Sequence, residues 1–260
     1  MRYLNLLTLL AGLGLGALGG FPFADAMTPD DIEEVTRQFV TAAGLAREAG
    51  FDAVELHLGH GYLLSQFLSP ATNRRTDAFG GSPAARARFP LAVVERVRAA
   101  LPPGFPVLAK VNLRDGFTGG FELADCVELA RWLAARGADA LVLSGGFVSR
   151  DAFYLFRGER PLRAMIAAER SLPQKVALAL FGPLVIRAHP FEPMYFLPLA
   201  REVRRAVDLP LALLGGITDL DHLHAARREG FELIAMARAL IHDPNLVARY
   251  QAGEAATSGC

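Results

Sequence analysis

Three side chains that could polarise an oxygen and move a proton lie in one short segment. His57, His60 and Tyr62 occur in the sequence ELHLGHGYLLSQFLSP at residues 55–70, at the end of a short apolar run. Imidazole N–H groups can donate hydrogen bonds to a carbonyl or anionic oxygen, and a neighbouring phenol can supply a proton. Two histidines three residues apart could also bind zinc on a helix, but the glycines beside His60 disfavour a helix and no third ligand lies at a suitable spacing. We therefore expect no metal site. Two interpretations stay open: the histidines are paired hydrogen-bond donors in a catalytic site, or they are structural residues whose hydrogen bonds are made within the protein at a strand end.

The elements that must position these side chains alternate between strand-like and helix-like patterns. The strand-like runs are continuously apolar at their centres, as expected for parallel strands covered on both faces, and lie near residues 52–57, 106–112, 139–144, 210–215 and 232–237. The helical patterns lie at residues 28–50, 83–100, 122–136, 197–207 and 219–228. This alternation indicates an α/β fold. A (βα)8 barrel and an open doubly wound sheet both bind ligands at the carboxyl ends of their strands, so the pattern leaves both architectures open.

One connection in this alternation is unusually long. A loop at about residues 147–193 follows the third strand-like run, and it includes RGER at 157–160 and FGP at 181–183. A long loop that leaves the carboxyl end of a strand is usually a lid or a substrate-binding loop, although an insertion without function would have the same signature.

Composition argues against several other functions. The 27 basic and 27 acidic residues cancel, and the absence of a basic stripe or an acidic block argues against nucleic-acid binding. The 52% hydrophobic content is enough for one large core. Two cysteines are too few for a disulfide framework, and Cys126, within a helical pattern, is expected to be a small core residue. We expect a cytoplasmic protein that acts on a small molecule without membrane contact.

The N-terminal segment differs from the rest of the chain. Residues 4–20 are almost wholly apolar, and Ala-Asp-Ala follows at 24–26, so one interpretation is a secretory signal or a membrane anchor. The segment also contains a Gly-x-Gly-x-x-Gly match at 14–19, but a helix begins soon afterwards where a dinucleotide-binding loop needs a βαβ unit. A chance Leu/Gly-rich stretch is the third interpretation.

A series of longer motifs resembles those of the old yellow enzyme (NADH:flavin oxidoreductase) family. Around the two histidines the resemblance runs from Gly50 through Phe89 and includes NRRTDAFGGS at 73–82. It continues through VLAKV at 107–111, LSGG at 143–146, LGGI at 214–217 and ARALIHDP at 237–244, and it covers about residues 21–253. These motifs are too many and too well ordered for a chance similarity.

This resemblance implies an FMN-binding (βα)8 TIM barrel that uses NAD(P)H as reductant and passes hydride to an activated alkene or a related acceptor. On the family's pattern, His57 and His60 bind the electron-withdrawing oxygen of the substrate, and Tyr62 supplies the proton. Lys110 stands where the family usually has Arg near the flavin N1/O2 edge, where a cation stabilises the charge of reduced flavin. The expected phosphate-binding residues are Gly215, Gly216, Ala237 and Arg238, with Ala237 in place of the more usual Gly.

The resemblance also implies an N-terminally truncated barrel. The family's His-x-x-His strand is the fourth of eight, so the five strand-like runs correspond to strands 4–8, and residues 1–50 do not suffice for strands 1–3. Residues 1–20 look foreign to the family, and residues 21–260 form the partial barrel. Five parallel strands leave two open edges, which favour edge-to-edge association or a homo-oligomer. Two hypotheses follow: a working flavoenzyme, or a catalytically inactive fragment of its barrel.

Overall fold

The computed structural model describes residues 25–151, 153–159 and 161–259. The three interpretations of residues 1–20 therefore concern a segment outside the described residues. The chain divides into two compact units, residues 1–38 and 39–260. Where the first unit is described, it contains the start of helix α2 (Pro29–Glu48). Thr28 caps this helix, because its hydroxyl accepts a hydrogen bond from the Asp31 N–H at 3.1 Å and its own N–H donates to the Asp31 carboxylate at 2.8 Å.

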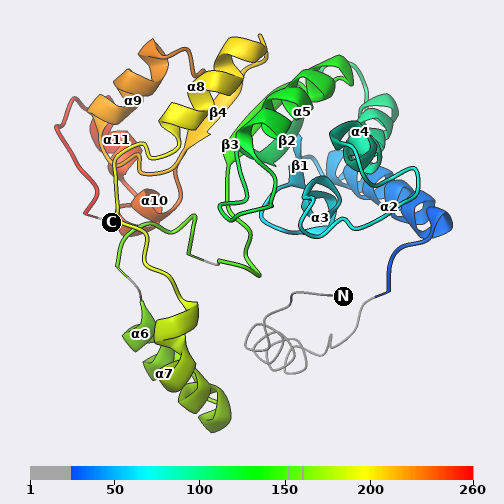
Figure 1. The fold of residues 1–260 in the computed structure, drawn as a ribbon. Helices are drawn as coiled ribbons and strands as arrows, with labels where there is room; N and C mark the ends of the chain where they lie inside the picture. The colour runs from blue at the N-terminus through cyan, green and yellow to red at the C-terminus, as the bar shows by residue number, and fades with distance from the viewer. Residues whose placement is uncertain (1–24, 152, 160, 260) are drawn as a thin grey trace. The chain divides into compact units, whose positions relative to one another are not determined.

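The second unit is built on a parallel sheet of five strands, which lie in the order of the chain (Figure 1). The strands are β1 (Val54–Leu58), β2 (Val107–Asn112), β3 (Ala140–Ser144), β4 (Leu211–Leu214) and β5 (Leu233–Ala235). Each predicted strand is present, and the α/β fold class with a parallel sheet is confirmed. Strand β5 is shorter than the predicted 232–237, because the chain turns into helix α10 (Arg238–His242) soon after Ala235.

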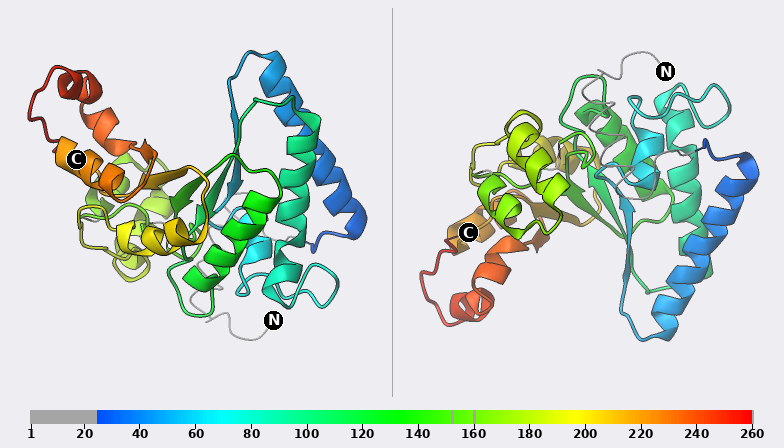
Figure 2. Two further views of the ribbon diagram at one scale, coloured as in Figure 1. Left: turned by 90° about the horizontal axis from the view of Figure 1, so that it is seen from above. Right: turned by 90° about the horizontal axis from the view of Figure 1, so that it is seen from below.

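Three longer helices pack side by side against this sheet (Figure 2). They are α4 (Pro83–Ala100), α5 (Leu123–Ala135) and α8 (Leu197–Ala206). Shorter helices follow the strands or close the C-terminal part: α3 (Leu63–Leu68), α9 (Leu220–Arg228), α10 and α11 (Leu246–Gln251). Cys126 of α5 is fully buried, as predicted, and burial raises the pKa of its thiol to about 12.

The two faces of the sheet carry different side chains. A row of neighbouring residues in register (Leu56, Ala109, Leu141 and Leu211) is buried. Successive residues of a strand point to opposite faces, so Glu55, His57 and Lys110 lie on the other face. His57 and Lys110 are register partners there, and neither is fully buried. The polar side chains of β1 and β2 therefore share one face, ending at the carboxyl edge of the sheet.

The connection at residues 147–193 is not a plain loop, which corrects the sequence-based expectation. It contains two helices, α6 (Leu162–Ala168) and α7 (Leu172–Val185), which pack against each other and project away from the sheet (Figure 1). Gly182 and Pro183, from the FGP sequence, lie in the last turn of α7. Within the described residues, no helix has the length and apolar character needed to cross a membrane.

Candidate active site

The structure brings the three predicted catalytic side chains together at the carboxyl end of β1. The His57 ring centroid lies 4.9 Å from that of His60 and 5.1 Å from that of Tyr62. His57 is the fourth residue of the strand, whereas the other two lie in the turn that leads to α3. His57 Nδ1 is buried and has no hydrogen-bond partner among the described residues. An orphaned polar atom of this kind is costly unless a ligand satisfies it.

The turn after β1 holds His60 in an uncommon backbone conformation. His60 has a φ of 60° and Gly61 a φ of 79°, so both occupy the left-handed region. The glycines on either side of His60 are needed for close approach. A Cβ at Gly59 would lie 2.7 Å from Asn112 Oδ1, and one at Gly61 would lie 2.5 Å from the Phe147 ring. The two glycines that disfavour a helix therefore let the turn fold against the neighbouring strand ends.

Asn112, the last residue of β2, organises this turn through its side chain. Its Oδ1 accepts a hydrogen bond from the His60 N–H at 3.0 Å. Its Nδ2 donates to the Gly146 carbonyl at 2.8 Å and to the Asp115 carboxylate at 2.9 Å. Asn112 is only 2% exposed, so these bonds are made away from water. One amide thus ties together the segments that follow β1, β2 and β3.

Ser144, the last residue of β3, contacts the His60 imidazole. Its Oγ lies 2.6 Å from His60 Nε2, and the residue is fully buried. The backbone completes this link, because the His60 carbonyl accepts a hydrogen bond from the Val148 N–H at 3.0 Å. Sequence reasoning missed Ser144 and Asn112, although each is a polar residue that ends an apolar strand run.

Both imidazoles favour the neutral form. Burial, followed by repulsion from His57 and Lys110, lowers the pKa of His60 to about 4. Burial and the Lys110 ammonium also lower the pKa of His57, against a smaller opposing effect from the Glu55 carboxylate. A neutral imidazole has one N–H donor, so the pair offers hydrogen-bond donors at neutral pH without carrying positive charge.

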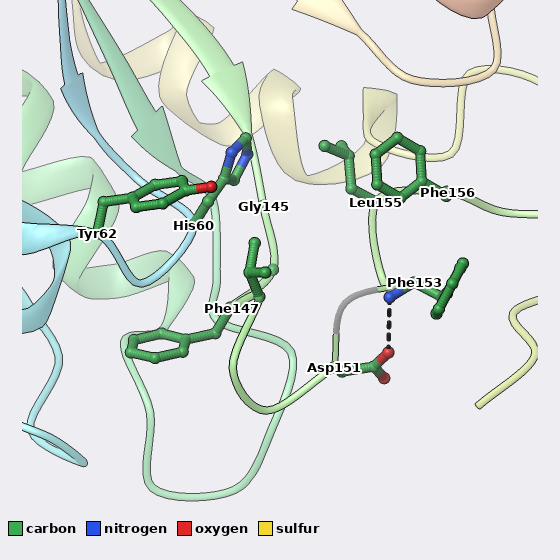
Figure 3. Close-up of a pocket in the computed structure, with 10 residues that line it drawn as sticks. His60, Tyr62, Gly145, Phe147, Asp151, Phe153, Leu155 and Phe156 are labelled. Atoms are coloured by element: carbon green, nitrogen blue, oxygen red, sulfur yellow. Dashed lines mark hydrogen bonds between the residues drawn. The ribbon is translucent and has the colours of Figure 1, made fainter. Parts of the chain in front are cut away.

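His60 and Tyr62 line a cavity of about 280 Å³ at the carboxyl end of β3. Figure 3 shows these two residues on one side of it and Leu155 and Phe156 on the other. Tyr62 is 54% exposed, so its hydroxyl is not sealed in the core. The cavity therefore combines polar groups from the β1 turn with an apolar wall from the segment after β3, and a small organic molecule would fit between them.

Lys110 lies across from His57, on the polar face of the sheet. Its Nζ forms an ion pair with Glu55 Oε1 at 2.6 Å. The structure therefore places the predicted flavin-edge cation next to the histidine pair, and a carboxylate already partners it. The same contact shows that Lys110 reaches along the sheet face toward β1 rather than into the helices.

The predicted phosphate-binding turns lie at the ends of β4 and β5. Gly215 and Gly216 have φ values of 102° and 72°, which a residue with a side chain adopts only with strain. A Cβ at Gly215 would lie 2.7 Å from the Tyr195 ring. Ala237 precedes α10 with a φ of −120°, so the alanine at this position needs no glycine-like conformation. Arg238 begins α10, and its guanidinium lies over the Phe156 ring at 5.6 Å.

Arg157, from the RGER sequence, joins this second cluster. Its guanidinium lies 4.9 Å from the Tyr195 ring centroid and 5.4 Å from that of Tyr154. Its carbonyl accepts a hydrogen bond from Arg238 Nη1 at 3.3 Å, and its Nε is buried without a partner among the described residues. Burial raises the pKa of Tyr195, an effect opposed by both guanidiniums. The sequence had drawn attention to RGER without giving Arg157 a role.

These residues satisfy the chemical requirements of an FMN site. Two left-handed glycines lie at a strand end, and two guanidiniums near them lack any carboxylate partner in the described part of the chain. Such groups suit a phosphate dianion. Lys110 supplies a cation on the polar sheet face. No group of three or more metal-ligating side chains is found among the described residues.

Comparisons with known proteins identify the family of this chain. The sequence profile of the NADH:flavin oxidoreductase / NADH oxidase family matches residues 17–151. The chain is 45% identical over 223 residues to 4,4'-dithiodibutanoate disulfide reductase of Rhodococcus erythropolis, covering 85% of this chain and 55% of that protein. It thus spans about half the length of that relative.

Two solved structures share the fold of this chain. A 2-naphthoyl-CoA reductase complex matches with a TM-score of 0.71 and 25% identity, covering 90% of this chain and 32% of that one. A morphinone reductase variant in complex with tetrahydroNAD matches with a TM-score of 0.61 and 25% identity, covering 90% of this chain and 52% of that one.

Proposed function

This chain belongs to the NADH:flavin oxidoreductase / NADH oxidase family, and from that premise we propose that it forms the acceptor-binding and phosphate-binding part of an FMN-dependent NAD(P)H oxidoreductase. The observation that carries this proposal is the cluster of His57, His60 and Tyr62 beside a cavity at the carboxyl ends of parallel strands. Neutral imidazoles and an accessible phenol are the groups needed to bind an electron-poor acceptor and protonate it.

Arg238, Gly215, Gly216 and Ala237 would hold the phosphate of FMN, and Lys110 would lie near its ring. When bound, FMN would supply the hydride chemistry, from NAD(P)H to the acceptor. Arg157 would add a second guanidinium at the phosphate. These assignments use two guanidiniums without a carboxylate partner in the described part of the chain, including the buried Arg157 Nε, and two glycines in the left-handed region.

The protein's own contribution is to bind and orient the acceptor. The His57 and His60 N–H groups would donate hydrogen bonds to the acceptor oxygen, which grows more negative as hydride arrives at the far carbon. Contact with Ser144 at 2.6 Å fixes the plane of the His60 ring and favours one tautomer. Tyr62 would then deliver the proton. The apolar wall formed by Phe153, Leu155 and Phe156 would exclude water from the reacting atoms.

The acceptor that fits this site best is an alkene conjugated to a carbonyl or a similar electron-withdrawing group. The relative from Rhodococcus is named for reduction of a disulfide, and we infer that a disulfide is a second acceptor class for this chain. Both reactions consume one hydride and one proton. Alkene reduction forms two C–H bonds, whereas disulfide reduction breaks the S–S bond and yields two thiols.

We further propose that the five strands correspond to strands 4–8 of an eight-stranded barrel. β1 and β5 pair on one side only within the described residues, and the chain spans 55% of the Rhodococcus relative. Strands 1–3 of such a barrel would supply further contacts to the flavin ring. The open edges suggest a second candidate function. In it, the chain binds FMN weakly through the phosphate and does not catalyse acceptor reduction.

One experiment distinguishes these two candidates. The purified chain would be titrated with FMN by fluorescence quenching, and NADH oxidation with an enone or a disulfide would be followed at saturating FMN. Replacing His57→Ala and His60→Ala together should lower acceptor reduction by about a hundredfold or more, because each lost donor of this kind has a large effect. FMN binding should be unchanged.

The matched control replaces two exposed histidines, His224→Ala and His242→Ala, and should leave the rate unchanged. A flavin-loaded double variant of His57 and His60 that retains the full rate would contradict the assignment. FMN binding without any turnover in the original chain would support the second candidate.

A further inference from the structure

Helix α7 has its apolar side chains on the outside. Every side chain of this helix that is described and exposed is apolar: Leu172, Pro173, Val176, Ala177, Ala179, Leu180, Phe181 and Pro183. Leu172 is 71% exposed and Leu180 64% exposed. The polar residues Gln174 and Lys175 are instead half-buried. A surface helix of a globular unit normally shows the opposite arrangement. The exposure of this apolar face to water is therefore unfavourable.

This apolar face is continuous rather than scattered. Leu172, Val176 and Leu180 are spaced four residues apart, so they lie along one stripe, and Phe181 adjoins its end. Val176 is 48% exposed and Phe181 52% exposed. Single exposed apolar side chains are normal, but a contiguous patch marks an interaction surface. The patch stands clear of the sheet, because α6 and α7 project away from it (Figure 1).

The segment that carries the apolar face is positively charged. Residues 161–187 contain the cations Arg163, Arg170, Lys175 and Arg187 and the single acid Glu169, which gives a net charge of +3, whereas the whole chain is neutral. The three arginines are exposed. Glu169 is half-buried and accepts a hydrogen bond from the Ser171 N–H at 2.7 Å. None of the four cations forms an ion pair with any carboxylate that the structure describes.

This charge pattern favours an anionic partner and disfavours a second copy of the chain. If two α7 helices packed against each other in antiparallel fashion, Arg170 at one end would face Arg187 of the other copy. In a parallel pair, each arginine would meet its own counterpart. The one acid of the hairpin is already engaged with Ser171, so neither arrangement neutralises these charges, and juxtaposed like charges oppose association.

We propose that the α6–α7 hairpin docks on an anionic lipid surface, with α7 lying in the plane of the interface. The exposed apolar stripe would enter the boundary of the acyl region, and the arginines would contact the lipid phosphates. The 14 residues of α7 are about 21 Å long, too short to cross a bilayer core of about 30 Å. The expectation against membrane contact came from composition and from the lack of a spanning segment, and a helix on the surface requires neither.

The test is sedimentation of the purified chain with vesicles. Vesicles of phosphatidylcholine alone would be compared with vesicles that contain an equal part of phosphatidylglycerol. The chain should bind the anionic vesicles and be released by high salt, because salt screens charge attraction. Replacing Leu172, Val176 and Leu180 together by Gln should weaken binding at least about tenfold. The matched control is Ile241→Gln, an apolar side chain that is 79% exposed on α10, and it should bind normally.

A second variant tests the charge separately from the apolar stripe. Arg163→Gln, Arg170→Gln and Arg187→Gln should weaken binding roughly fivefold for each cation removed, while circular dichroism shows an unchanged fold. Failure to sediment with anionic vesicles would overturn the proposal, and so would equal binding to both vesicle types. A dimer in analytical ultracentrifugation that the Leu172/Val176/Leu180 variant dissociates would also overturn it, since the stripe would then be an interface between copies.

Discussion

The two ends of the sheet's carboxyl edge are stabilised in different ways. At the β1–β3 end, directed hydrogen bonds from Asn112 and Ser144 fix the turn that carries His60. At the β4–β5 end, Arg157 and Arg238 lie over aromatic rings. At the first end, His57 Nδ1 and Arg114 Nε lack hydrogen-bond partners among the described residues, but the turn itself is held by protein groups. The second end gathers cations that an anion would neutralise. On the proposed assignment, the acceptor site is therefore preorganised, whereas the phosphate site beside it depends on its ligand.

The largest expected effect is a loss of stability at the β1–β3 end, which depends on the side chain of Asn112. Asn112→Leu removes the partners of the His60 N–H, the Gly146 carbonyl and the Asp115 carboxylate in a site that is 2% exposed. Each unsatisfied buried group costs about 1–3 kcal/mol, so the free energy of unfolding should fall by about 3 kcal/mol or more. Urea denaturation measures it.

The matched control is Asn245→Leu, the same substitution at an exposed position. It should change the free energy of unfolding by less than about 0.5 kcal/mol. Equal losses in the two variants would mean that the Asn112 network does not stabilise the β1–β3 end.

The second prediction concerns the cations of the β4–β5 end. Arg238→Gln should weaken FMN binding about tenfold to a hundredfold, and Arg157→Gln about tenfold, because charge-assisted hydrogen bonds to a phosphate are each worth about 1.5–3 kcal/mol. Riboflavin, which has the same ring and no phosphate, should bind both variants as it binds the original chain. Isothermal titration with the two ligands gives the comparison, with Arg228→Gln, an exposed cation on α9, as control.

The two ligands separate the roles of these arginines. If an arginine only supports the local fold, its replacement would weaken riboflavin and FMN binding alike. In that case the two cations would serve to pack on aromatic rings, Arg157 on Tyr154 and Tyr195 and Arg238 on Phe156, rather than to bind a phosphate.

The sequence was sufficient to predict what lies close together in the chain. The five strands follow from continuous apolar runs, and His57, His60 and Tyr62 meet because a strand end and a tight turn connect them. The helix predicted from residue 28 is present as α2, with Thr28 as its cap. Local pattern and local geometry are linked directly in these cases.

Contacts between distant segments were not predicted. Ser144 lies 84 residues from His60 in the chain, and Arg157 lies 81 residues from Arg238. The Ser144 contact depends on strand register, which places Asn112 opposite Ser144. The Arg157 contact depends on the path of the β3–α8 connection. That path includes α6 and α7, whose helical character was hidden by Gly182, Pro183 and an apolar face without a buried partner.

The third prediction tests the division of labour within the acceptor site. Tyr62→Phe removes the hydroxyl and keeps the ring against His57. Reduction of an enone by the flavin-loaded chain should slow by about tenfold to a hundredfold, because a positioned acid contributes at least that much. Reduction of the flavin by NAD(P)H needs no proton from this residue and should keep its rate. Stopped-flow measurement of the two half-reactions provides its own control, and equal slowing of both would contradict the proton-donor role.

The smallest expected effect is a pH dependence of stability, which we assign to the two histidines at the β1–β3 end. In the folded chain, burial and the charges of His57 and Lys110 lower the pKa of His60 to about 4, from an ordinary value of 6.5. Between these values the unfolded chain binds a proton that the folded chain does not. The free energy of unfolding should therefore decrease as the pH falls from about 6.5 to about 4. His57, whose pKa is also lowered, adds to the same slope.

His60→Asn should flatten this slope without removing it, because His57 remains. Asparagine tolerates the left-handed backbone at this position, and the backbone N–H keeps its hydrogen bond to Asn112. The exposed His224→Asn should leave the slope as it is. Thermal unfolding midpoints of the three proteins, measured from pH 4 to pH 7, give the slopes to compare. The effect should be modest, since both imidazoles are partly open to solvent, which screens their charge. A slope that His60→Asn does not change would mean that His60 is not held neutral, and that the acceptor site presents a cation to its ligand.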